Sequence, residues 1–444
     1  MFRLQLVSRL KKLAAWSHKP MWEQFLRKVK LIVQDEILRT RILFVLAALV
    51  VFRFLAIIPI PGINVAQLES FLSNNQFLGL LNIFSGGGFS NLSIMMIGVS
   101  PYITASIVMQ LMTILIPKLK EMYQEEGDAG RMRFTQYSRY LSIPLAFIQA
   151  FGFLLLLQQN GIVSQLTPLA LVTNVIVIAA GAILLMWIGE LISEFGIGNG
   201  ISLIIFAGIV SSLPSAAAQL IFSFDVSQVP VYIGFAAAAA LIIAGVVFIT
   251  EAERPIPVTY ARRVRGTKVL GGISTYLPLR VNQAGVIPII FALSILLFPQ
   301  MIATFLTKSS IAFVASAGNA IVGALANQWV YGILYFFLVF VFTYFYTAIT
   351  FEPNQIAKNL QKNGAFIPGV RPGGTTSEYL GNIITRITLV GALFLGVLAV
   401  LPLILQGITG ITAITIGGTA LLIVVSVVLD VVKKVDAQTS IREY

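Results

Sequence analysis

The chain alternates long apolar runs with shorter polar segments, and the length of those runs is its strongest structural signal. A transmembrane helix needs about twenty mostly apolar residues to cross a hydrocarbon core about 30 Å thick. Runs of this kind, each bounded by charged or turn-forming residues, are predicted to be membrane-spanning helices. The ten predicted spans are residues 42–60, 92–116, 141–158, 168–189, 201–221, 230–250, 284–306, 329–351, 387–405 and 411–432.

The composition agrees with a membrane protein and argues against an enzyme. Of 444 residues, 57% are hydrophobic and 11% are charged, and the mean hydropathy is +0.90. The chain has no cysteine and one histidine, His18, so thiolate metal sites and cysteine nucleophiles are excluded and a Ser/His/Asp triad nearly so. No phosphate-binding loop of the G-x-x-x-x-G-K-[ST] type occurs. We therefore expect no catalytic residue, no metal and no cofactor.

The basic residues set the predicted orientation. If the N-terminus is cytoplasmic, 28 of the 30 lysines and arginines fall in the segments that the ten spans leave on the cytoplasmic side. The positive-inside rule favours this arrangement, with both termini cytoplasmic. An error of one span would reverse the side of every later loop, so the asymmetry also supports the count of ten.

Ten spans divide into two sets of five, and an odd number makes the second set cross in the opposite sense to the first. This is the geometry of an inverted repeat around a central site. Ten spans without internal symmetry explain the same pattern equally well. The expected divisions are a cytoplasmic segment 1–41, an N-terminal half 42–221, a C-terminal half 222–432 with cytoplasmic loops 251–283 and 352–386, and a cytoplasmic tail 433–444.

The outer segment between the first two spans has an unusual composition. Its apolar part, near residues 77–90, is too short to span and contains the glycines Gly86, Gly87 and Gly88, which break a helix. Irregular backbone at membrane depth is tolerated only where protein covers it or where it lines a water-filled cavity. The segment is predicted to be either a movable re-entrant element or an amphipathic helix on the outer surface.

Polar residues are sparse in the spans. Thr104, Gln149 and Asn282 are expected to face other helices, where interhelical packing explains them more simply than gating. The two long cytoplasmic loops are basic, and positive-inside retention explains most of these charges one by one. Loops longer than about 15 residues are usually functional or disordered, so their length favours docking of a partner.

The sequence fits two other classes of protein less well. A secondary transporter of a small solute also uses inverted five-span repeats, but such transporters carry buried ion-coupling acids, and no cluster of them occurs in the predicted spans. An intramembrane enzyme would need an acid, a base or a metal constellation, which the sequence lacks.

Seven short stretches, in order, resemble the SecY/Sec61-alpha family of protein translocation channels from about Leu38 to the end. Each is weak alone, and together they are very specific. They are Phe52-Arg53 with Ile58–Gly62, Asn82–Gly87, Pro101–Ile107, Gly196–Ser202, Ala284–Pro288, Gly364–Gly373 and Gly417–Thr419.

The resemblance implies an all-α polytopic membrane protein of ten helices in two inverted halves around a central pore, with a re-entrant plug. The family's pore is closed by an aliphatic ring, and its lateral gate lies between spans 2 and 3 and spans 7 and 8. The matching positions here are Val99, Ile103, Ile205, Ile290 and Ile423 for the ring; Leu81, Asn82, Ile83, Phe84, Ser85, Gly86 and Gly87 for the plug; and Thr104, Gln149, Asn282, Ser294 and Phe298 for the gate.

The resemblance also implies a function and partners. The family passes unfolded polypeptides across the bacterial plasma membrane, which is the inner membrane, and releases apolar segments laterally into lipid. The partners implied are the SecE and SecG subunits, the SecA motor, the ribosome with its RNA, the nascent polypeptide and membrane lipid. Partner-binding positions are expected at Arg262, Arg263, Arg265, Lys268, Lys358 and Arg371.

Overall fold

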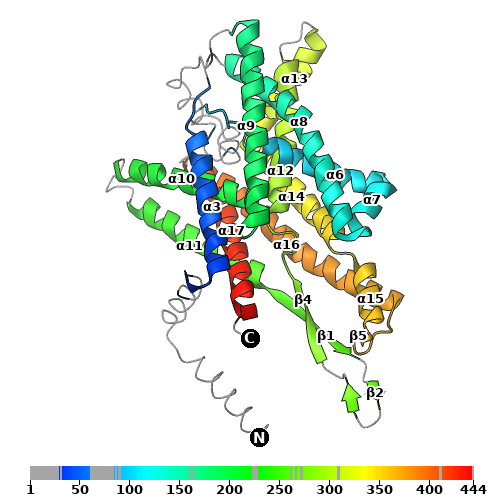
Figure 1. Cartoon of the computed structure of the whole chain (residues 1–444). Helices are drawn as coiled ribbons and strands as arrows, with labels where there is room; N and C mark the ends of the chain where they lie inside the picture. The colour runs from blue at the N-terminus through cyan, green and yellow to red at the C-terminus, as the bar shows by residue number, and fades with distance from the viewer. Residues whose placement is uncertain are drawn as a thin grey trace.

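The protein is a bundle of long helices with a small β-structure at one end (Figure 1). A computed structural model describes residues 30, 33–60, 85, 88, 92–159, 161, 163, 166–222, 229–260, 263–265, 268–270, 274–307, 311–409 and 413–442. The helices are α3 (Glu36–Leu55), α6 (Ser100–Leu115), α7 (Pro117–Gln124), α8 (Gly127–Gln159), α9 (Pro168–Phe195), α10 (Gly200–Phe222), α11 (Val229–Glu251), α12 (Ile287–Leu306), α13 (Ala312–Ala326), α14 (Gln328–Thr350), α15 (Pro353–Lys362), α16 (Gly374–Thr409) and α17 (Ala413–Arg442).

Every one of the ten predicted spans overlaps a helix, and local capping explains several helix starts. Asp35 accepts hydrogen bonds from the amides of Ile37 and Leu38 at 3.0 and 3.1 Å at the start of α3. By length and apolar composition, four helical segments of the described part of the chain are able to cross a membrane: 127–158, 168–195, 328–362 and 374–401. The pair α6 and α7 also qualifies together and is bent by 112°. Shorter apolar stretches, again counted over described residues only, are 200–214, 236–251, 287–296 and 312–326.

The predicted start of the second span, at residue 92, is wrong. Residues 92–99 form turns, and α6 begins only at Ser100 because Pro101 fits the first helical turn, where its missing N–H is not needed. Leu92 and Gly98 have φ values of 42° and 63°, which an α-helix cannot contain. The turns are anchored by the Ile60 amide, which donates to the Leu92 carbonyl at 2.9 Å. Non-helical backbone therefore lies buried beside the helices.

Other helix bounds also differ from the predictions. The helix α8 begins at Gly127 and α16 at Gly374, each more than a turn before the predicted span, so these helices continue beyond their apolar cores. The predicted tail from residue 433 continues α17 as far as Arg442. The apolar helix α13 lies in a segment that was predicted to be an outer loop.

The two predicted cytoplasmic loops form one β-structure, which corrects the expectation of an all-α fold. A three-stranded antiparallel sheet has the order β4 (Ser274–Arg280), β1 (Glu253–Tyr260), β5 (Ala365–Phe366). The strands β2 (Arg263–Arg265) and β3 (Lys268–Leu270) pair beyond it. The side chains of Ile256 and Val258 alternate inward along β1 and pack with β5 and the start of α16. This apolar core joins the two loops.

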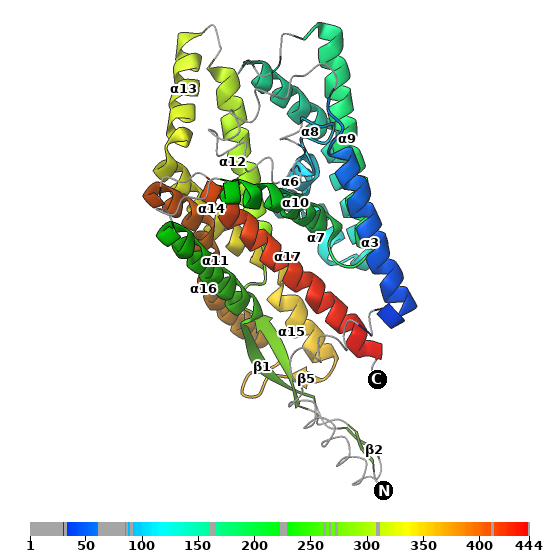
Figure 2. The same cartoon turned by 90° about the vertical axis from the view of Figure 1, so that its left-hand side faces the viewer.

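The helices form two groups that meet at two seams. One group contains α3, α6, α8, α9 and α10, where α8 contacts α6 and α9, and α9 contacts α3 and α10. The other contains α11, α12, α14, α16 and α17, where α14 contacts α12 and α16, and α17 contacts α11 and α16. Between the groups, α6 contacts α12 and α10 contacts α17. In Figures 1 and 2 the start of α3, the end of α17 and the strands lie at one end, and α13 lies at the opposite end.

Candidate pore constriction and lateral gate

The five predicted ring residues meet in one buried apolar cluster. Val99 is the N-cap of α6 and Ile103 lies in its first turn; Ile205 lies in α10, Ile290 in α12 and Ile423 in α17. Their side chains are 0%, 7%, 0%, 7% and 1% exposed, respectively. Four helices from both groups therefore contribute these aliphatic side chains to the apolar core that the groups share.

The ring has an aromatic neighbour that sequence reasoning missed. Tyr331 and Tyr335 of α14 belong to the same cluster, and Phe291 of α12 makes edge-on contacts with Phe342 and Tyr346 at centroid separations of 6.1 and 6.0 Å. Aromatic rings at this spacing add packing energy beyond their buried area. A sequence pattern does not reveal this contact because α14 reads as uniformly apolar.

The four predicted gate residues with described side chains are buried. Thr104 lies in α6, Gln149 in α8, Asn282 just before α12, and Ser294 within α12. The amide nitrogen of Asn282 donates to the Gly285 carbonyl at 3.2 Å. The side-chain oxygens of Gln149 and Asn282 have no hydrogen-bond partner among the described residues. The side chain of Phe298, the fifth predicted gate residue, lies outside the described part.

Most of the predicted plug also lies outside the described residues: Leu81, Asn82, Ile83, Phe84, Gly86 and Gly87. Ser85 is described and fully buried. Gly88 lies three residues later, and the Gly88 carbonyl accepts a hydrogen bond from the Ser93 amide at 2.9 Å. A Cβ added at Gly88 would lie 2.8 Å from the Ser93 hydroxyl, so this glycine permits a close approach to the turns before α6.

Of the predicted partner-binding residues, Lys358 and Arg371 are exposed on the β-structure's end of the molecule. Arg371 lies between Gly369 and Gly373, whose φ values of 81° and 104° need glycine, and its carbonyl accepts from the Thr376 hydroxyl at 2.8 Å. Arg263 and Arg265 lie on β2 and Lys268 on β3, where only the backbone is described; Arg262 lies outside the described residues.

Sequence reasoning also missed a polar contact between consecutive spans. Arg139 of α8 and Glu190 of α9 form an ion pair through Nε and Oε1. Both residues occur near the cytoplasmic ends of adjacent antiparallel spans in the predicted topology. Their opposite charges at matching depth were the signal from which this pair was predictable.

These features define a class: a multi-helix membrane protein with an aliphatic cluster between two helical groups and a polar-lined seam beside it. Comparison with known proteins gives the family. The SecY family model matches residues 93–432. The chain is 43% identical over 427 residues to the protein translocase subunit SecY of Mycobacterium tuberculosis, covering 92% of this chain and 96% of that protein. It is 40% identical to the same subunit of Corynebacterium glutamicum, with coverages of 91% and 96%. This chain belongs to the SecY family.

Solved structures agree with this fold. A structure described as a protein-conducting channel aligns with a TM-score of 0.63 at 21% identity, covering 93% of this chain and 95% of that one. Sec61 in a canine ribosome–channel complex from the endoplasmic reticulum aligns with a TM-score of 0.60 at 20% identity, with the same coverages. These relatives do not support the alternative of a small-solute transporter.

Proposed function

We propose that this chain is the central, channel-forming subunit of a protein translocase, which passes unfolded polypeptides across a membrane and releases apolar segments sideways into lipid. The observation that carries the proposal is the burial of five aliphatic side chains, from four helices of both groups, in the apolar core that the groups share. A narrow apolar constriction excludes water and blocks ions, and it binds no single passing side chain strongly.

The seam between α6 and α12 is the proposed lateral gate, flanked by α8 and α14. It is supported by the burial of Thr104 on α6 and Ser294 on α12, two helices that touch across the groups. Buried polar groups without partners cost free energy. The unpartnered oxygens of Gln149 and Asn282 are therefore suited to a seam that opens, where water or a passing backbone satisfies them.

The remaining architecture is proposed as ten spans in two inverted halves, residues 42–221 and 222–432, with both termini cytoplasmic and a re-entrant plug near 77–90. The arrangement is supported by the overlap of each predicted span with a helix.

Because the chain has no cysteine, single introduced cysteines report directly on which side of the membrane they lie. We expect an impermeant maleimide to label Ser316→Cys in intact cells and Ser274→Cys only in inverted vesicles; the opposite labelling would refute the topology.

The proposed partners are SecE, SecG, the SecA motor, the ribosome and its nascent chain, in the bacterial plasma membrane. The exposed Arg371 and Lys358 support docking at the β-structure, because glycine-shaped loops on a packed scaffold present side chains to partners. The similarity to Sec61 in a ribosome–channel complex supports the ribosome as a partner. The proposed channel supplies no energy itself, so a bound motor or the ribosome has to drive transport.

Reconstitution tests the function. Vesicles containing this chain with SecE and SecG, supplied with SecA and ATP, are expected to import an unfolded secretory protein into a protease-protected space. A variant of that substrate carrying a strongly apolar segment of about twenty residues is expected to remain in the bilayer. Failure to protect the substrate, or accumulation of a small solute against its gradient in vesicles holding this chain alone, would refute the channel.

A further inference from the structure

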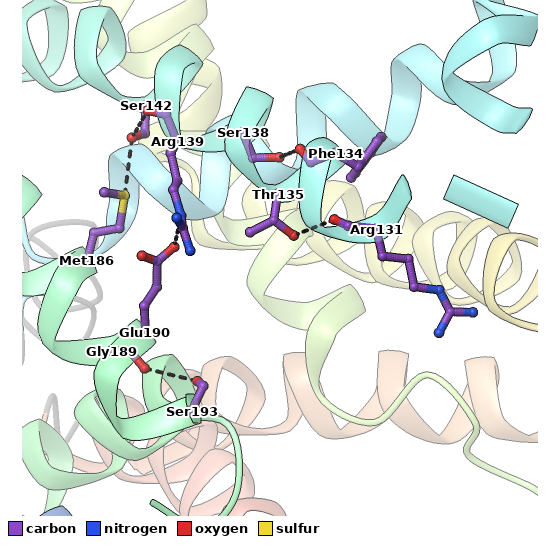
Figure 3. A network of polar contacts seen from close by, with 10 residues as sticks. All are labelled: Arg131, Phe134, Thr135, Ser138, Arg139, Ser142, Met186, Gly189, Glu190 and Ser193. Atoms are coloured by element: carbon purple, nitrogen blue, oxygen red, sulfur yellow. Dashed lines mark hydrogen bonds and ion pairs between the residues drawn. The ribbon is translucent and has the colours of Figure 1, made fainter. Parts of the chain in front are cut away.

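The ion pair between Arg139 and Glu190 joins the N-terminal half of α8 to α9 (Figure 3). One turn further along α8, the Ser142 hydroxyl lies 3.4 Å from the sulfur of Met186, one turn earlier in α9. The two contacts therefore lie side by side in the antiparallel register of the two helices. They form a polar lock between neighbouring helices of the same group.

Small residues continue this contact toward the middle of the helices. Ala146 of α8 and Ala179 and Ala182 of α9 form their own buried cluster, with exposures of 1%, 0% and 4%. Small side chains let helix backbones approach closely, which is the main source of helix association in a bilayer. A tight apolar contact beyond a charged lock makes α8 and α9 a stiff pair.

The lock also reaches the helix that carries the ring. The helix α6 contacts both α8 and α9, and the Tyr102 hydroxyl of α6 lies within electrostatic range of Glu190 and Arg139. Tyr102 immediately precedes Ile103 of the ring and Thr104 of the seam. Charges held at a fixed place by the ion pair therefore lie beside the first turn of α6, where the constriction and the seam meet.

The two partners of the ion pair differ in how far their side chains are exposed to solvent. The side chain of Glu190 is 18% exposed and that of Arg139 is 41% exposed. Glu190 is the more buried partner, so reversing Arg139 leaves the Glu190 carboxylate without its compensating charge in a region of lower dielectric than bulk water. The pair of Arg133 and Glu126, at 66% and 40% exposure and 3.6 Å, carries the same charges near the start of α8 but faces solvent, where ion pairs contribute little. Charge reversal at Arg133 therefore serves as a control for charge reversal at Arg139.

We propose that Arg139 and Glu190 are positioning residues of the lateral gate. Their ion pair holds α8 on α9 and fixes charge beside α6, so that these three helices move as one body and the seam opens between α6 and α12. Without the pair, α8 is held less firmly against α9. The seam between α6 and α12, which α8 flanks, then opens more easily. This inference rests on the proposed function, because it assigns a role in lateral release.

Charge reversal and charge exchange test the proposal in the reconstituted system. The readout is the ratio of laterally released to fully translocated chains for a substrate segment of marginal hydrophobicity. Arg139→Glu and Glu190→Arg are each expected to raise this ratio about fivefold, since coupling between contacting residues is typically about 1 kcal/mol. The double variant R139E/E190R restores the pair and is expected to restore the ratio. The control Arg133→Glu leaves it unchanged.

A second readout separates this inference from the function itself. Spin labels at the exposed positions Tyr140→Cys and Leu191→Cys, on the naturally cysteine-free chain, report the distance between α8 and α9 without any substrate. Single reversal is expected to broaden the distance distribution, and the double variant to narrow it again. If the unchanged protein fails to translocate, the proposed function falls while this distance test still stands. A broadened distribution with an unaltered release ratio, or a double variant that stays broad, would overturn the positioning role.

Discussion

Asparagine at Ile290 and Ile423 is expected to turn a sealed protein into one that leaks ions and exports poorly targeted chains. Both side chains are at most 7% exposed in the cluster between the seams. Replacing each isoleucine forfeits burial worth about 1.5–3 kcal/mol and adds an amide that needs hydrogen-bond partners. Water supplies those partners, so the constriction becomes hydrated. We expect ion flux through vesicles to rise at least about tenfold, the factor that 1.4 kcal/mol produces.

Two controls make this result specific to the ring. Leucine at the same two positions keeps the surface apolar and is expected to keep the seal. Val339 of α14 is fully buried in the same cluster but outside the ring. Val339→Asn is therefore expected to lower the melting temperature without opening a leak. Equal leaks from Val339→Asn and the ring variants, or tight vesicles with both ring asparagines, would contradict the assignment.

Arg371→Glu is expected to abolish most motor-driven export while leaving the ion seal intact. The side chain is exposed in a loop that is held in shape by Gly369 and Gly373 and anchored through Thr376. Reversing a charge that meets an opposite charge in a docked partner costs about 2–5 kcal/mol, so export is expected to fall by at least about tenfold. The measurement is the rate of substrate protection at saturating ATP, with motor binding followed in parallel.

The control for this prediction lies on the neighbouring helix. Lys362 is exposed at the end of α15 and carries the same charge. Lys362→Glu changes the net charge of this end of the molecule equally, and it is expected to reduce export far less. Equal defects in both variants would assign the effect to overall charge, and normal export with Arg371→Glu would remove this loop from the docking surface.

Apolar run length was enough to locate ten of the helices but not their ends, and it missed α13. Ten predicted spans overlap helices because a bilayer imposes one length on every crossing. The start of the second span was wrong because residues 92–99 are as apolar as a helix would be, yet form turns against Ile58 and Ile60. The signal for their shape is local: Gly98 with φ of 63° and Pro101 in the first turn. The high hydropathy of the segment does not distinguish these turns from a helix.

Long-range pairing was beyond the reach of the sequence. Thr259 of β1 pairs with Phe366 of β5, more than a hundred residues away. Turn-forming residues such as Pro255, Pro257 and Gly266 indicate β-like turns in the loop 251–283, but nothing local indicates a partner strand in 352–386. The apolar residues that join them, such as Ile256 and Leu380, read in the sequence as parts of unrelated segments.

Some residues of the candidate site were likewise predictable from the sequence, whereas their contacts were not. Val99, Ile103, Ile205, Ile290 and Ile423 were expected through family resemblance, since single aliphatic residues in apolar helices look like ordinary packing. Their convergence needs the three-dimensional fold. The pair of Arg139 and Glu190 is the reverse case, because the topology and the two charges were both visible and only their contact was missing.

Contact between a moving polypeptide and the ring tests the central claim most directly. A substrate stalled in mid-transport by a folded domain at its end is crosslinked to a photoreactive residue at Ile103, Ile205 or Ile290, with Ile148 and Ile176, which are exposed on α8 and α9, as comparison sites. Adducts are expected at all three ring positions, dependent on stalling, and few at the comparison sites. Adducts confined to the comparison sites, with none in the ring, would contradict it.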